Sequence, residues 1–246
     1  MGAQPRNTPP GGWRPPRTHL LLQPEQREEF VRAVDFSADA VVIDAFRRGE
    51  DPDLALLWAC IRALVDARGR MGWAPQLWLR VHPAFTPECA DELAQLAGIE
   101  EGLILPKVRS AEDVQWVADR APAAKVLPVI ENQDALSRVT PIAGHPAVCR
   151  LGFSARGLAA SATTEDGLLP PDEALVWQRR IVVAAAAAAG LPGPVNAVQE
   201  ARTFEAEAFI HDAEQALRSG FTGQCVTSLH QLACLRARLP IGTATG

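Results

Sequence analysis

The stretch QLWLRVHP at residues 76–83 decides the fold of this chain. It contains an apolar run that ends in a charged residue, Arg80, and three later stretches have a similar form: LPKV at 105–108, VIEN at 129–132 and LGFS at 151–154. Helix-like sequence follows each of them. Buried parallel strands are near-continuous apolar runs, and charged or small residues gather where their carboxyl ends face a site. The four stretches therefore predict neighbouring parallel strands with a site at one end.

Eight strand–helix units follow one another over residues 17–240. The expected strands are short and rich in Val, Ile and Leu: His19–Gln23, Ala40–Ala45, Gln76–His82, Gly102–Val108, Lys125–Glu131, Val148–Ser154, Pro194–Gln199 and Gly223–Thr227. A doubly wound sheet usually has about five or six strands and a glycine-rich first turn, and no GxGxxG follows the first strand here. The sequence therefore predicts a single (β/α)8 TIM barrel.

Helical patterns separate these strands. They cover Pro24–Phe36, Asp53–Ala67, Pro87–Leu96, Ser110–Asp119, Gln133–Thr140, Asp172–Ala189, Phe204–Ser219 and Ser228–Leu239. The Pro/Gly-rich residues 1–16 cannot build a core, so we expect a disordered tail there and a flexible C-terminus over residues 241–246.

Composition excludes several classes of function. With a net charge of −5, the chain gives no reason to expect nucleic acid or an acidic membrane as a partner. Its longest apolar stretch, Ile181–Ala189, is far shorter than a bilayer span, and the first 16 residues have no apolar signal-peptide core. The 5 cysteines are widely spaced and form no CxxC pair, which favours reduced thiols and a cytoplasmic protein.

From Arg17 onward the chain resembles the HpcH/HpaI aldolase and citrate lyase beta-subunit superfamily. The resemblance rests on seven segments in the right order: Arg17-Thr18, Ala38–Asp44, Arg80-Val81-His82, Leu105–Val108, Val129-Ile130-Glu131, Leu151–Ala159 and Gly220–Gln224. It implies a barrel of the phosphoenolpyruvate/pyruvate-domain type. It also implies a carbon–carbon lyase that acts through an enolate on a small oxoacid or an acyl-CoA thioester.

The resemblance also implies roles for particular residues. By position, Arg80 matches the arginine that binds the substrate carboxylate, and Glu131 matches the first ligand of a divalent metal, usually Mg²⁺. Asp44 would support the catalytic site, while Lys107 and Arg156 would add positive charge for an anionic substrate. A metal in such a site polarises a carbonyl and stabilises the enolate.

The chain departs from the family pattern at positions that should be functional. The second metal carboxylate is expected at Gly157, which has no side chain, and its neighbour Arg156 is itself a cation. Since Mg²⁺ needs hard oxygen ligands, its site looks incomplete unless Glu165 or Asp166 reaches in. Further departures occur at Phe46, Arg47, Asn196 and Gln224, where the family has other polar residues.

Ordinary structural roles compete with each of these assignments. Arg80 either contacts a ligand or forms an ion pair with Glu131 or Asp44. Glu131 is a metal ligand or a salt-bridge partner of Arg80 or Arg156, and Asp44 orients a ligand or pairs with Arg47. Lys107 either binds substrate or covers the rim. His82 is expected to be a hydrogen-bonding rim residue rather than a catalyst.

Two functions remain open at this point. The first is a lyase or aldolase of the citrate lyase beta-subunit type, with Arg80 on the carboxylate and Glu131 on the metal. The second is a catalytically degenerate barrel that keeps an anion pocket and binds an anionic ligand or a partner protein. In that case Arg47, Arg80, Lys107 and Arg156 would form a cationic mouth. Homo-oligomerisation is compatible with both.

Overall fold

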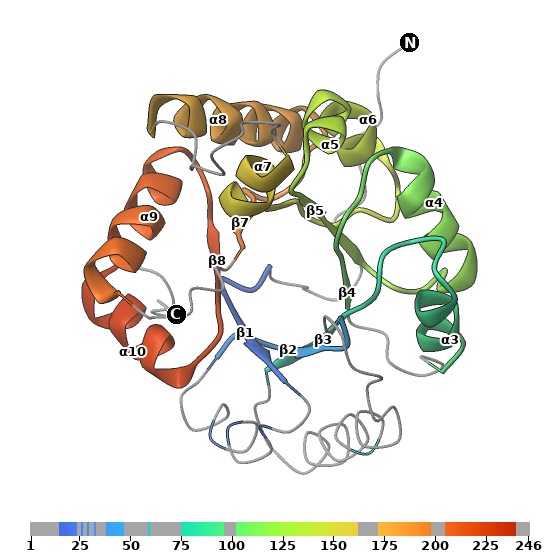
Figure 1. Cartoon of the computed structure of the whole chain (residues 1–246), viewed down its shortest axis with the longest axis horizontal. Coiled ribbons are helices and arrows are strands. Elements are labelled where there is room, and N and C mark those ends of the chain that lie inside the picture. Colours follow the sequence, from blue (N-terminus) through green and yellow to red (C-terminus); the bar gives the residue numbers. More distant parts are fainter. Residues whose placement is uncertain are drawn as a thin grey trace.

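The computed structural model describes residues 15–23, 38–46, 75–95, 102–161, 172–197 and 205–239, and the single positions Gln26, Glu29, Arg32 and Ala59. Eight parallel strands pair in chain order, and the last pairs with the first to close the ring (Figure 1). The strands are β1 Thr18–Leu22, β2 Ala40–Asp44, β3 Gln76–Arg80, β4 Gly102–Leu105, β5 Val126–Ile130, β6 Gly152–Phe153, β7 Val195–Asn196 and β8 Gly223–Val226. The predicted (β/α)8 barrel is confirmed.

Helices surround this ring (Figure 1). Those described are α3 Pro87–Gln95, α4 Ala111–Arg120, α5 Gln133–Ser137, α6 Val139–Gly144, α7 Ala155–Ser161, α8 Asp172–Ala188, α9 Ala206–Arg218 and α10 Leu229–Arg238. The helices expected over 24–36 and 53–67 lie largely outside the described residues, as do residues 1–14 and 240–246. Within the described ranges, no helix is both long and apolar enough to cross a membrane.

Two helical details differ from the prediction. The segment expected as one helix over 133–140 forms two short helices, α5 and α6, which meet at Arg138. Helix α7 was not predicted at all. Helix α4 begins with a capping box, in which the Ser110 side chain accepts from the backbone N–H of Glu112 and Asp113 accepts from the backbone N–H of Ser110.

Side chains alternate between the inside and the outside of the ring, as the period of a strand requires. The outward set packs with the helices in one large apolar cluster. A smaller cluster belongs to the interior: Leu21, Ala40, Val42, Trp78, Ile104, Leu127, Val129, Val195 and Cys225. The register places Asp44 level with Arg80, so both inward-facing polar side chains lie at the carboxyl end of the ring.

A buried arginine lies at the opposite, N-terminal end. Arg150 is 1% exposed and donates from Nε to the carbonyl of Gly193 and from Nη2 to Oγ1 of Thr222, both at 2.7 Å. Its third donor, Nη1, meets the carbonyl of Pro16. These acceptors immediately precede strands β7, β8 and β1, so Arg150 ties together the starts of strands from both ends of the chain. Burial lowers the pKa of Arg150 to about 10.

Candidate functional site

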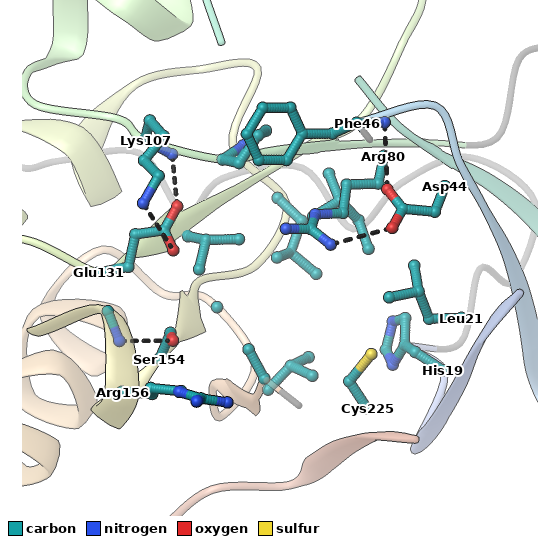
Figure 2. Close-up of a pocket in the computed structure, with 18 of the residues that line it drawn as sticks. His19, Leu21, Asp44, Phe46, Arg80, Lys107, Glu131, Ser154, Arg156 and Cys225 are labelled. Carbon is teal, nitrogen blue, oxygen red and sulfur yellow. Dashed lines mark hydrogen bonds and ion pairs between the residues drawn. The ribbon is translucent and has the colours of Figure 1, made fainter. Parts of the chain in front are cut away.

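A cavity of about 720 Å³ opens at the carboxyl end of the barrel and extends down between the strands. Its mouth is lined by side chains at or just after strand ends, and these include three cations and two carboxylates: Arg80, Lys107, Arg156, Asp44 and Glu131. In Figure 2 the Arg80–Asp44 pair and the Lys107–Glu131 pair lie on opposite sides of the view. The prediction that Arg80, Lys107 and Glu131 share one end of the barrel is confirmed.

Arg80 is held in place by its neighbours. Its Nη1 lies 3.2 Å from Oδ2 of Asp44, and its guanidinium lies over the ring of Phe46 at 5.1 Å from the centroid. Asp44, only 1% exposed, also accepts from Gln23 Nε2 at 3.0 Å and from the backbone N–H of Phe46 at 3.1 Å. These contacts fix the plane of the guanidinium, and a planar guanidinium matches the geometry of a carboxylate. Asp44 thus positions Arg80, and its expected alternative partner, Arg47, lies outside the described residues.

Glu131 is paired with Lys107, whereas the sequence left it open between a metal ligand and a salt bridge with Arg80 or Arg156. The backbone N–H of Lys107 donates to Glu131 Oε1 at 2.6 Å, and the ammonium lies 3.8 Å from Oε2. Lys107 adopts φ 55°, a left-handed conformation that costs a non-glycine residue roughly 1–2 kcal/mol. This backbone conformation lets both the amide and the ammonium of Lys107 reach the carboxylate of Glu131.

The position expected to supply a second metal carboxylate is packed against the first. A β-carbon on Gly157 would lie 2.6 Å from Glu131 Cβ and 3.0 Å from Glu131 Oε2, well inside van der Waals contact. Both Glu131 oxygens already face Lys107. Nowhere in the described parts of the chain do three or more His, Cys, Asp or Glu side chains gather as metal ligands do. Glu165 and Asp166 lie outside those parts. The residues present therefore do not fit a Mg²⁺ site of the expected kind.

Helix α7 brings Arg156 to the cavity. The hydroxyl of Ser154 accepts from the backbone N–H of Gly157 at 3.1 Å, which is the contact of a helix cap. The sequence signal for this helix is Ser154, a residue type favoured at the start of a helix, followed by the seven residues ARGLAAS. Its first turn places Arg156 and Gly157 on the cavity wall.

Two of the positions at which the chain departs from the family pattern, Asn196 and Gln224, lie outside the cavity lining. Asn196 Nδ2 donates to Asp212 Oδ2 at 2.7 Å and to Gln224 Oε1 at 3.1 Å, and Asp212 also pairs with the buried Arg179 of α8. This network lies between the strands and helices α8 and α9. Both side chains point out of the ring and have structural partners there.

His82 also has a structural setting. Its Nδ1 lies 2.7 Å from Oε1 of Glu92, its backbone N–H donates to Oε2 of the same carboxylate, and Phe46 contacts its ring edge. Burial raises the pKa of Glu92. His82 is not among the residues that line the cavity. Its expected hydrogen-bonding role is consistent with these contacts.

Sequence reasoning missed two polar residues of the cavity lining, Gln23, which donates to Asp44, and His19. His19 lies on β1 with its side chain inside the ring, 0% exposed, and contributes to the cavity lining. Burial, with a smaller effect of Arg150, holds its pKa well below the usual value. An isolated histidine in an apolar strand carries no distinctive motif, which explains why it was missed.

A closed parallel barrel with a charged cavity at its carboxyl end is the architecture of the TIM-barrel proteins, in which that end carries the functional site. No protein-family model and no curated protein matches the sequence.

Solved structures show which barrels this one is similar to. RipC from Yersinia pestis has 21% identity and a TM-score of 0.70, covering 90% of this chain and 94% of that chain. The citrate lyase beta subunit of M. tuberculosis, complexed with oxaloacetate and magnesium, has 22% identity and a TM-score of 0.70, covering 92% and 97%. CitE from Mycobacterium tuberculosis with magnesium, acetoacetate and coenzyme A has 22% identity and a TM-score of 0.70, covering 91% and 80%. The chain therefore has the same barrel fold as these structures.

Proposed function

We propose that this barrel binds an anionic ligand, a small oxoacid or an acyl-CoA thioester, at the mouth of its cavity. The observation that carries the proposal is Arg80, a guanidinium fixed by Asp44 and Phe46 at the entrance of a cavity. A fixed planar fork suits bidentate contact with a carboxylate, and the side chain loses little freedom when it binds.

Charge around the mouth supports an anionic ligand. Among the described residues that line the cavity, three are cations, Arg80, Lys107 and Arg156, and two are carboxylates, Asp44 and Glu131. Because each paired carboxylate is also hydrogen-bonded by backbone N–H groups, it is held in place and does not compete freely with a ligand.

Binding is favoured over metal-dependent catalysis because position 157 has no room for a second carboxylate. In this proposal Arg80 orients the ligand carboxylate, Lys107 adds a second positive charge, and Glu131 holds the Lys107 backbone in its left-handed turn. The barrel would then serve as a binding or regulatory protein, and no Mg²⁺ step is required.

A carbon–carbon lyase is the second candidate. It is favoured by the presence of both Arg80 and Glu131 at the cavity, and by the similarity to citrate lyase beta-subunit structures that hold oxaloacetate and magnesium. Such a reaction breaks the bond between a hydroxyl-bearing carbon and the carbon beside a thioester carbonyl. The hydroxyl loses its proton and becomes an oxoacid carbonyl, and the enolate left behind takes up a proton.

Calorimetry with oxaloacetate tests the two candidates. Binding without added magnesium, weakened at least about ten-fold by Arg80→Ala, is the expected result. Binding that requires magnesium, together with cleavage of a hydroxyacyl-CoA followed by proton NMR, would favour the lyase instead. Absence of any binding to oxaloacetate, acetoacetate or acetyl-CoA would contradict both.

A further inference from the structure

The floor of the cavity contains a polar group with no visible protein partner. Neither Nδ1 nor Nε2 of His19 has a hydrogen-bond partner in the part of the chain that the structure describes. The ring contacts the edge of Trp78 with centroids 5.8 Å apart, and Cys225 is its neighbour in the strand register. Figure 2 shows His19 beside Leu21 and Cys225, below the Arg80–Asp44 pair.

An imidazole in this position has unused capacity for hydrogen bonds. Burial keeps the ring neutral, since it lowers the pKa of His19, and a neutral imidazole offers one N–H donor and one nitrogen acceptor. Buried polar groups in folded proteins are nearly always hydrogen-bonded. His19 is among the residues at the far end of the cavity, and its ring nitrogens are fully buried, so a ligand group contacts them after a small shift of the apolar side chains beside the ring.

The strand register gives the distance between the mouth and the floor. His19 is level with Ala40, which is four residues before Asp44, the residue level with Arg80. With a rise of about 3.3 Å per residue and a strand tilt near 36°, the floor is about 10 Å below the mouth. The wall between them is apolar and is formed by Leu21, Ile104, Leu127, Val129 and Val195.

We propose that His19 forms a second binding subsite, which takes the terminal hydroxyl of a carboxylic acid whose carboxylate is bound by Arg80. This inference rests on the proposed function of Arg80 and extends it to a ligand class: acids with an apolar chain of about six carbons and a neutral polar end. A hydroxyl matches the ring because it both donates and accepts. A second charged end is excluded by the cost of burying it at the apolar floor.

Two matched probes test the subsite by calorimetry on the full chain: hexanoate, and the hydroxyhexanoate with its hydroxyl on the terminal carbon. The wild-type protein is expected to bind the hydroxy acid about ten-fold more tightly, the effect of a well-made buried hydrogen bond. His19→Leu should abolish this preference and keep hexanoate binding, and His19→Gln should restore part of it. Val195→Ala, which changes the same wall without touching a polar group, should keep the preference.

Ring-nitrogen NMR of the wild-type protein gives an independent readout if a His19 variant fails to fold. The hydroxy acid should shift the nitrogens of one neutral histidine, whereas hexanoate should not. Equal affinity for the two acids, with both dependent on Arg80, would overturn the His19 subsite and leave the anion site intact. Failure of the wild-type protein to bind either acid would overturn the His19 subsite. The anion site at Arg80 is tested separately, by calorimetry with oxaloacetate.

Discussion

Glu131 and Gly157 are packed so closely that a β-carbon at position 157 would lie 2.6 Å from Glu131 Cβ. The two positions are therefore neighbours, as a pair of metal ligands would be, yet one of them has no room for a side chain. Close approach, and not backbone conformation, is what requires glycine here.

Replacement of this glycine should destabilise the protein. Gly157→Ala forces Glu131 or helix α7 to shift, and overpacking of this kind costs about 1–3 kcal/mol. Urea unfolding measures the loss. Gly144→Ala is the matched control, because no heavy atom lies within 4 Å of its added β-carbon. Equal stability of Gly157→Ala and wild type would show that the Glu131 contact yields easily, and Gly157→Asp could then supply a metal ligand.

Removal of Arg80 should weaken anion binding more than removal of Lys107. The Arg80 guanidinium is fixed by Asp44 and is 19% exposed as a side chain, whereas Lys107 is 43% exposed and its ammonium is 3.8 Å from its partner. A charged hydrogen bond contributes about 1.5–3 kcal/mol, so Arg80→Ala should lose roughly ten- to a hundred-fold in affinity for oxaloacetate. Arg80→Lys should recover only part of it. Equal losses in Arg80→Ala and Lys107→Ala would contradict this order.

Asp44 should act on a ligand only through Arg80. Asp44→Asn keeps the size of the side chain and removes the charge that fixes the guanidinium, so affinity for oxaloacetate should fall several-fold. In an Arg80→Ala background the same substitution should have no further effect, because the group it positions is gone. Additive losses in this double-mutant cycle would instead indicate direct contact between Asp44 and the ligand.

Stability should fall in mild acid because of His19. Burial lowers the pKa of His19 well below its ordinary value near 6.5. In mild acid this imidazole is therefore protonated in the unfolded chain but stays neutral in the folded chain. The contribution of this group is complete above about pH 6.5 and is lost at up to about 1.4 kcal/mol per pH unit as the pH falls below it. Urea unfolding at several pH values, in wild type and His19→Leu, measures it. The difference between the two slopes isolates His19, since Glu92 and His145 titrate in both proteins; identical slopes would contradict the assignment.

The fold was readable from sequence because buried parallel strands have a strong local signature. The runs 77–79 and 126–130 are apolar throughout, and the charged residues that follow them, Arg80 and Glu131, mark their carboxyl ends. The short strands β6 and β7 lie within the expected ranges 148–154 and 194–199. Helix α7 was missed because it has only seven residues, and its buried positions, Ala155, Leu158 and Ala159, include a single large apolar side chain.

The site was only partly readable, because partners are decided by tertiary geometry. Arg80 and Asp44 pair as one of the sequence alternatives proposed. The Glu131–Lys107 pair depends on a positive φ at Lys107, which no residue preference indicates. Successive side chains of a strand point alternately into the ring and toward the helices. Val195 and Cys225 point inward, so their neighbours Asn196 and Gln224 point toward the helix layer.

Arg150 determines how the ring is completed. Its guanidinium reaches Pro16, 134 residues earlier in the chain, and Thr222, 72 residues later, at the joint where the first strand meets the last. Contacts between such distant segments form late, because the intervening chain must first be ordered. Arg150 therefore holds β1 and β8 together at the N-terminal end of the barrel. Without its guanidinium, these two strands should be the first to separate. Amide hydrogen exchange in β1 and β8 should then become faster before exchange in the other strands does.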